Sequence, residues 1–440
     1  MKTVFLSILF LSFCYSTNAG TIEDAMKKIP RANAGSIDGV IEYIKDNASS
    51  DRDKAKAVYC WITYNVKYDV KKFLKDKPSN SKPEDVFKKK LAVCEGISNL
   101  YKEMCVKLGL KCEIVDGFSK GFGYKTGAGF TEADHAWNVV MFDGSWHIVD
   151  ATWGAGEIRK GIFRQKFKRN PSDDYFDQSP KDVILMRAPE IAMWQLLSDP
   201  VSLKTFMAGD KKIAEHFKNP GKTVYSFKDT INYYLGLAEK IKIPEYGRMA
   251  LKYNSRNSIP LAFGIFRQTA EFLMQQNGKL EEKQFDSLSL SVKNAIDLLK
   301  NKRSVRSAVQ EAIDKGLIDA HEMQSGIYLL KSEYPRKRMM NTNINSYDSL
   351  SLYSNQYIKC LSLVVAETKE SENKKMYKEL NNDLCEMYVA LYDSYSKFFK
   401  LETNPRKQRE IKKEMDAQLK IANRIAMEGS NCAKLIQQRK

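Results

Sequence analysis

The sequence has little of what metal, cofactor and nucleic-acid sites require. It holds only 4 histidines among 440 residues and no Cys-x-x-Cys pair, so nothing in it resembles a zinc site. It contains no phosphate-binding loop and no dinucleotide fingerprint. Zinc-finger spacing and the aromatic and glycine signature of RNA-binding domains are also missing. We therefore expect no metal, no cofactor and no dedicated nucleic-acid binding.

Long apolar runs are scarce as well. The longest one occupies residues 4–13, follows a basic start and precedes the small-residue site at Ala19, which is the pattern of a secretory signal peptide over residues 1–19. Cys14 raises a lipoprotein alternative, but Phe13 stands where that signal needs a small residue. No later stretch is apolar and long enough to cross a membrane. We expect an exported protein, periplasmic or extracellular.

The overall composition is that of a globular protein. Hydrophobic residues make up 43% and charged residues 28%, and the length predicts two or three domains. The 71 Lys and Arg exceed the 54 Asp and Glu, giving a net charge of +17 that attracts anionic surfaces. This charge leaves open either solvated faces or a patch for an anionic envelope surface, with basic runs at Arg159-Lys160, Arg164, Lys166, Lys168-Arg169 and Arg336-Lys337-Arg338.

Seven cysteines remain after residue 19, and an odd number leaves at least one thiol unpaired in an exported protein. That thiol is either reactive or buried and inert. If Cys94 is free, the other six allow fifteen disulfide connectivities, so the pairing stays open. The six are Cys60, Cys105, Cys112, Cys360, Cys385 and Cys432.

Hydrophobic spacing divides the chain into a mixed part and a helical part. Residues 20–155 combine helices near residues 55–65 and 94–108 with strands at 112–118, 136–142 and 145–152, and a glycine-rich loop at 119–131. Residues 156–220 look like a connecting segment packed on this core, and residues 221–440 are helical with no recognisable role. We expect one helix over 231–241, others at 288–299 and 376–398, and a charged surface helix at 405–427.

Asp143-Gly144 between two strands is a strong hairpin signal. With these two residues as the loop, Phe142 pairs with Ser145, and side-chain alternation places His135, Trp137 and Asp150 on one face. Asp150 is then a diagonal neighbour of His135, within side-chain reach. This geometry suits a carboxylate that orients an imidazole, and equally a structural histidine. His147 points to the opposite face.

Cys94 is the cysteine with an electrostatic advantage. It begins a helix, where unpaired N–H groups and the helix dipole favour a thiolate. The other cysteines of this region lie mid-helix, near a helix end or on a strand. A thiolate beside an imidazolium held by a carboxylate is an activated nucleophile for acyl transfer.

Several segments together resemble the transglutaminase-like superfamily. They are AVCEGIS (92–98), ADHAWN (133–138) and WHIVDATWG (146–154), with the upstream WITYNVKYD (61–69). The order Cys, His, Asp and the intervals of 41 and 15 residues are typical of this family. Pro189 and the segment WQLLSDP (194–200) resemble a tail of some exported bacterial and kyphoscoliosis-peptidase-like members. A histidine often stands two positions before that proline, whereas this chain has Arg187, so no role is carried over to that position.

The resemblance covers about residues 40–155 and implies an α+β, papain-like core, with a helix bearing Cys94 packed on an antiparallel sheet. It implies Cys94 as nucleophile, His135 as general base and acid, and Asp150 as the orienting carboxylate. The backbone N–H of Cys94 is one expected donor to the oxyanion. Trp153 is expected in the core, whereas cleft or oxyanion support is considered for Trp61, Tyr68 and Trp137, with a core role as the alternative for the first two.

The implied chemistry is acyl transfer from an amide or peptide bond of a protein or peptide substrate. Water as acceptor makes a protease or amidase, and an amine makes a cross-linking transglutaminase. Exported members of the family favour hydrolysis. The alternative is a non-catalytic binding module with the same fold, which recognises an envelope glycan or a protein.

Overall fold

The computed structural model describes most of the chain beyond residue 20. The described residues are 21–76, 81–125, 129–160, 165–221, 224–276, 280–300, 302, 306–341, 347–371, 374–427 and 432–438. The predicted signal peptide with Cys14, and Arg164 of the basic runs, lie outside them. Contacts divide the chain into two units: unit 1 comprises Met1–Tyr124 and Asp134–Arg187, and unit 2 comprises Lys125–Ala133 and Ala188–Lys440. The predicted connecting segment 156–220 is therefore shared between both units.

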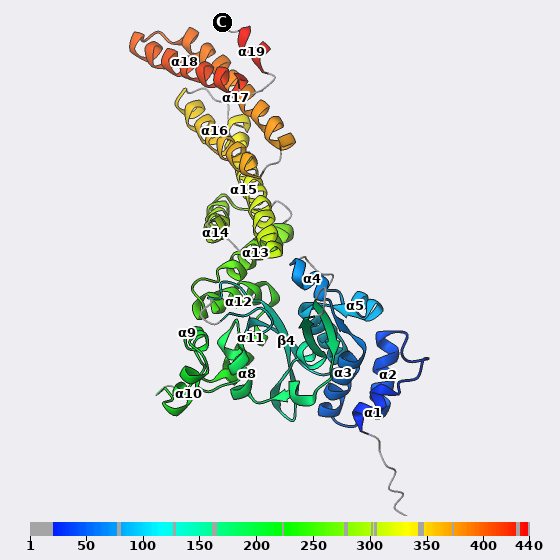
Figure 1. Ribbon diagram of the computed structural model, residues 1–440. Helices are drawn as coiled ribbons and strands as arrows, with labels where there is room; N and C mark the ends of the chain where they lie inside the picture. Colours follow the sequence, from blue (N-terminus) through cyan, green and yellow to red (C-terminus); the bar gives the residue numbers. More distant parts are fainter. Residues whose placement is uncertain are drawn as a thin grey trace, which may run out of the picture. The chain divides into compact units, whose positions relative to one another are not determined.

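Unit 1 is the mixed α+β part (Figure 1). Its helices are α1 (Ile22–Lys27), α2 (Ile37–Asn47), α3 (Asp51–Asn65), α4 (Val70–Lys75), α5 (Pro83–Lys89), α6 (Cys94–Lys107), α7 (Ala151–Gly154), η1 (Asp173–Tyr175) and α8 (Pro180–Met186). Its strands are β1 (Lys67–Tyr68), β2 (Leu91–Ala92), β3 (Cys112–Ser119), β4 (His135–Phe142), β5 (Ser145–Val149), β6 (Gly156–Lys160), β7 (Gln165–Arg169) and β8 (Phe176–Gln178), with β9 (Arg187–Pro189) at the division between the units.

The main sheet has the strand order β8-β5-β4-β3-β9. Strand β4 pairs antiparallel with β3 and with β5, and Phe142 faces Ser145 as predicted. The two loop residues, Asp143 and Gly144, both have positive φ, of 48° and 70°, which matches the right-handed twist of the strands. The predicted hairpin register is confirmed.

Helices α3 and α6 supply the core that supports this sheet. Their buried faces include Val58, Ile62, Ile97 and Leu100, which belong to one hydrophobic cluster with residues of β4 and β5. Helix α6 ends at Lys107, so the predicted helix is confirmed, and Gly109 follows it with φ 82°. Cys94 and His135 each begin an element of this packed core, α6 and β4, which fixes their positions along the chain.

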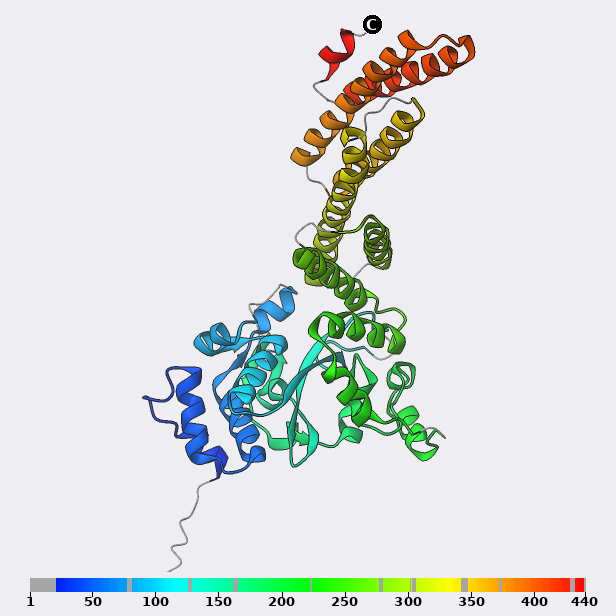
Figure 2. The same ribbon diagram turned by 180° about the vertical axis from the view of Figure 1, so that it is seen from behind.

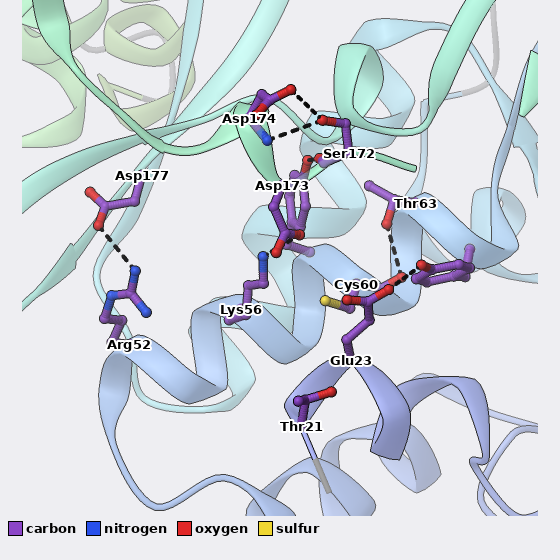
Figure 3. A network of polar contacts seen from close by, with 12 residues as sticks. Thr21, Glu23, Arg52, Lys56, Cys60, Thr63, Ser172, Asp173, Asp174 and Asp177 are labelled. Atoms are coloured by element: carbon purple, nitrogen blue, oxygen red, sulfur yellow. Dashed lines mark hydrogen bonds and ion pairs between the residues drawn. The ribbon is translucent and has the colours of Figure 1, made fainter. Parts of the chain in front are cut away.

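Ion pairs hold α3 to the segment that precedes and forms β8 (Figure 3). Lys56 Nζ lies 2.5 Å from Asp173 Oδ1, and Arg52 Nη2 lies 3.4 Å from Asp177 Oδ2. Ser172 Oγ donates to Asp174 Oδ2 at 2.8 Å, which closes the turn at η1. These contacts place β8 beside β5, at the edge where β5 leads into Asp150.

Two predicted elements are wrong. The strand expected at 145–152 ends at Val149, because Asp150 caps α7: its Oδ1 accepts the backbone N–H of Trp153 at 2.9 Å. The helix expected over 231–241 is divided into α11 (Phe227–Gly236) and α12 (Glu239–Tyr253), because Leu237 has the extended ψ of 144°. The apolar spacing of residues 231–241 continues across the break between α11 and α12, so the spacing alone did not reveal that the helix is divided.

Apart from the end of β9, the regular elements of unit 2 are helices in its described residues. Its helices are η2 (Ala192–Gln195), α9 (Leu203–Met207), α10 (Asp210–Lys218), α11, α12, α13 (Ile259–Gln276), α14 (Glu282–Lys300), α15 (Ser307–Asn341), α16 (Tyr347–Glu370), α17 (Lys374–Leu401), α18 (Pro405–Met427) and α19 (Ala433–Gln437). One cluster joins α13, α14 and α15, and another joins α16 to α19. Helices α17 and α18 lie side by side (Figure 2). A disulfide joins Cys385 of α17 to Cys432.

The predicted fold class, an α+β core followed by a mostly helical part, is confirmed. The predicted helices at 288–299, 376–398 and 405–427 correspond to α14, α17 and α18. Among the described residues, no helix is both long and apolar enough to cross a membrane.

Candidate active site

Cys94 is the first residue of α6 and is partly exposed. It is positioned by β2, which pairs in parallel with β1 and leads through Val93 into the helix. Gly96 allows this close approach, because a Cβ there would lie 2.9 Å from Ala92 Cβ and 3.0 Å from Val86 Cγ2. No side-chain hydrogen bond caps α6 in the described structure, so the N–H groups of its first turn remain available to an anion.

His135 and Asp150 meet in the interior of unit 1. The Nε2 atom of His135 lies 2.8 Å from Oδ2 of Asp150, and their side chains are only 5% and 0% exposed. The thiol of Cys94 also interacts with the His135 ring. Because Nε2 is engaged by Asp150, Nδ1 is the ring nitrogen that remains for Cys94. The structure therefore brings the three predicted residues into one chain of contacts.

The charges in this chain support one another. Burial by itself lowers the pKa of His135, but the charge and hydrogen bond of Asp150, together with Cys94, raise it to about 10. Burial by itself raises the pKa of Asp150, but His135, Arg187 and the Trp153 N–H lower it to about 2. An imidazolium held in this way is the partner that stabilises a neighbouring thiolate.

Arg187 is a site residue to which the sequence analysis assigned no role. Its side chain is 1% exposed, Nη1 donates to Oδ2 of Asp150, and Nη2 donates to Oε1 of Gln178. The guanidinium lies 4.6 Å from the ring centroid of Trp153. Asp150 thus receives hydrogen bonds from His135, from Arg187 and from one backbone N–H.

The predicted aromatic residues have different outcomes. Trp137 is buried with its ring 5.7 Å from that of His135, so it packs beside the imidazole and does not line an open cleft. Trp61 lies in the core, stacked on Phe87 at 4.9 Å. Tyr68 lies on β1 and pairs with Ala92 of β2. Ala92 stands two residues before Cys94 in the sequence.

Trp153 was expected in the core, and this expectation is wrong. Its ring is only half-buried and stacks on His135, with centroids 5.3 Å apart and 24° between the planes. The cause is α7: the chain turns at Asp150, so Trp153 is carried over the imidazole and not into the sheet. Gly121 packs on its outer edge, where an added Cβ would lie 3.2 Å from Trp153 Cζ2.

The remaining candidates lie away from this chain of contacts. His147 stacks on Phe142 and pairs with Asp177 at 2.6 Å, on the opposite face of β5 as predicted. Cys60, Cys105, Cys112 and Cys360 are buried thiols that form no disulfide in the described structure. The described residues contain no group of three or more His, Cys, Asp or Glu side chains that could hold a metal ion.

The arrangement can carry out nucleophilic acyl chemistry. A partly exposed cysteine lies beside a buried imidazole, the imidazole is fixed by a carboxylate, and the cysteine begins a helix that has no side-chain cap. Residues 38–151, which contain all three side chains, match the transglutaminase-like superfamily. This part of the chain belongs to that superfamily.

Named proteins from several animals are similar to part of this chain. The chain is 37% identical over 172 residues to the kyphoscoliosis peptidase of Mus musculus, covering 38% of this chain and 26% of the mouse protein. It is 32% identical over 197 residues to the Lim and transglutaminase domain protein ltd-1 of Caenorhabditis elegans, covering 42% and 27%. The chain thus spans about a quarter of the length of these relatives.

Proposed function

We propose that the protein is an exported cysteine enzyme that cleaves amide or peptide bonds of protein or peptide substrates through an acyl-enzyme. The observation that carries this proposal is the continuous chain from Cys94 through His135 to Asp150, in which only the sulfur end is partly exposed. Membership of the transglutaminase-like superfamily supports cysteine chemistry for the same three residues.

The reaction divides into two halves. The Cys94 thiolate attacks the substrate carbonyl carbon, and the resulting oxyanion accepts hydrogen bonds from N–H groups at the start of α6, including that of Cys94. The C–N bond then breaks, and the imidazolium of His135 gives its proton to the departing amine, leaving a thioester on Cys94. Asp150 keeps the ring oriented with Nδ1 towards the sulfur throughout.

In the second half we propose water as the acceptor. His135 takes a proton from the water as it attacks the thioester, and the thiolate of Cys94 leaves, releasing the carboxylic acid and restoring the starting ion pair. An amine attacking in the same way would form a new amide bond. Two relatives carry the word peptidase in their names, which supports hydrolysis.

Export is part of the same proposal. It is supported by the signal-peptide pattern of residues 1–19 and by the Cys385–Cys432 disulfide, a bond that persists in oxidising compartments. The net charge of +17 supports residence near an anionic envelope surface.

The first test measures how the rate of Cys94 alkylation by iodoacetamide depends on pH, read by peptide mass. In the native protein we expect the midpoint well below the value of about 8.5 of a free thiol. His135→Ala should raise that midpoint. His147 is the matched control, since it also pairs with a carboxylate, that of Asp177. His147→Ala should leave the midpoint unchanged, because this pair lies on the opposite face of the strand. Cys60 is an internal reference, since burial raises its pKa to about 12.

Substrate assays then separate the acceptors. Peptide mixtures report hydrolysis, and a glutamine-containing peptide with a fluorescent amine reports transfer; both activities should vanish in Cys94→Ala. A native Cys94 midpoint near 8.5 that does not respond to His135→Ala would contradict the enzymatic proposal. The chain would then be a binding module, and Cys94→Ala would leave binding intact.

A further inference from the structure

We propose that Arg187 is a positioning residue of this active site, which holds Asp150 as a carboxylate during the half of the cycle in which His135 is neutral. This inference rests on the proposed function, because it concerns the proton transfers of the same three residues.

Arg187 has the geometry of a dedicated counter-ion. Its Nη1 donates to the Asp150 oxygen that also faces His135 Nε2, and its Nη2 is fixed by Gln178 Oε1. Neither Arg187 nor Asp150 is more than 1% exposed, so water cannot take the place of either partner. The ring of Trp153, 4.6 Å from the guanidinium, covers the pair and also stacks on His135.

The need for a permanent cation follows from the reaction itself. His135 starts as an imidazolium, gives away its proton when the amine leaves, and regains one from water. While His135 is neutral, the carboxylate of Asp150, which is 0% exposed, would have no opposite charge beside it if Arg187 were absent. An uncompensated buried charge has a high free-energy cost. The carboxylate of Asp150 would then take up a proton or move away from His135. Arginine keeps its charge at any working pH, so Arg187 balances Asp150 at every step.

The Asp150–Arg187 pair is neutral as a whole, and this affects Cys94. Forming the thiolate adds a negative charge to the site, which is easier when Asp150 is already balanced. Without the guanidinium, Cys94 and Asp150 would share a single cation, His135. An opposite charge in direct contact shifts a titration by about 1–3 pH units. Arg187 contacts Asp150 and acts on Cys94 only through Asp150 and His135, so the expected effect on the Cys94 thiol lies at or below the low end of that range.

The test repeats the pH dependence of Cys94 alkylation in the full-length chain with Arg187→Gln and Arg187→Lys. Arg187→Gln should raise the alkylation midpoint by up to about 1 unit, which lowers the rate at a pH below the midpoint by up to about tenfold. Arg187→Lys keeps the positive charge but loses the planar pair of N–H donors. Because the charge remains, its alkylation midpoint should stay close to that of the native protein. A purely structural role would affect both variants alike.

Arg169→Gln is the control, because Arg169 is a partly buried arginine of unit 1 that donates to the backbone oxygen of Thr63. It should leave the midpoint unchanged. If Arg187→Gln does not fold, judged by tryptophan fluorescence, Gln178→Leu carries the test. Gln178→Leu removes the hydrogen bond that fixes the Arg187 guanidinium, so it should raise the Cys94 alkylation midpoint by less than Arg187→Gln would. An unchanged midpoint in Gln178→Leu would overturn the inference.

His135→Ala, measured beside these variants, separates the two possible failures. If His135→Ala raises the midpoint and folded Arg187→Gln does not, the inference about Arg187 is wrong and the proposed function stands. If His135→Ala has no effect, the proposed function fails, and the inference fails with it.

Discussion

Replacing His135 with Gln should remove a specific pH dependence of the stability of unit 1. The folded protein raises the pKa of His135 from 6.5 to about 10, because the effects of Asp150 and Cys94 exceed that of burial. At about 1.4 kcal/mol per unit, this shift corresponds to a stabilisation on the order of 4–5 kcal/mol. Since the pKa is higher in the folded state, the stabilisation is complete below pH 6.5 and is lost as the pH rises towards 10.

The assay is urea unfolding followed by tryptophan fluorescence from pH 6 to pH 10. Four of the five tryptophans lie in unit 1, so this fluorescence reports mainly on that unit. The difference in unfolding free energy between the native protein and His135→Gln should fall by about 1.4 kcal/mol per pH unit between roughly pH 7 and pH 10. His147→Gln should keep the native slope.

The difference between the two proteins is the informative quantity, because other groups titrate in the same range. Burial lowers the pKa of Lys90 to about 8, so its contribution to stability increases as the pH rises from 8 towards 10.5. Lys90 is present in both proteins and cancels. A difference that stays constant within about 1 kcal/mol across the range, less than one pKa unit, would refute the conclusion that Asp150 holds His135 as an imidazolium.

Further predictions concern other parts of the two units. Asp150→Asn should remove the loss of stability of unit 1 that the native protein shows as the pH falls from 3.8 towards 2, because the folded state lowers the pKa of Asp150 to about 2; acid titration of the fluorescence measures it. Gly154→Ala should lower the unfolding free energy by about 1–3 kcal/mol in urea titrations, because the new Cβ would lie 2.0 Å from the Tyr59 hydroxyl oxygen. Cys385→Ser should lower the stability of unit 2 by about 2–4 kcal/mol, an effect that circular dichroism should reproduce when a reductant is added to the native protein.

The hairpin shows how much of the site the sequence could predict. Asp143-Gly144 determined a two-residue turn, and the strict alternation of strands then placed His135 on the face of Asp150 and His147 on the other. Both steps use local rules that tertiary packing did not override. The helix that begins at Cys94 followed in the same way from its apolar spacing.

Arg187 and Trp153 could not be found by these rules. Arg187 is 37 residues from Asp150 along the chain, and an arginine between apolar residues carries no local sign that its charge will be buried. The strand was predicted through Thr152, which left no place for the turn that carries Trp153 over His135. The sequence does contain a signal for the earlier strand end, since Asp150 is a favourable N-cap for the turn that follows, and its side chain accepts the Trp153 N–H.

Cys94 is the exposed end of this chain of contacts, and this arrangement has a chemical consequence. Cys94 is partly exposed, whereas the side chains of His135, Asp150 and Arg187 are only 5%, 0% and 1% exposed. Substrate can therefore reach only the sulfur end, and protons enter or leave the site through Nδ1 of His135. The two inner residues carry charges that do not change during the reaction, so the single mobile proton is confined to the imidazole, the leaving group and the acceptor. Variants of the inner pair should therefore alter the pH dependence of the reaction more than the affinity for substrate.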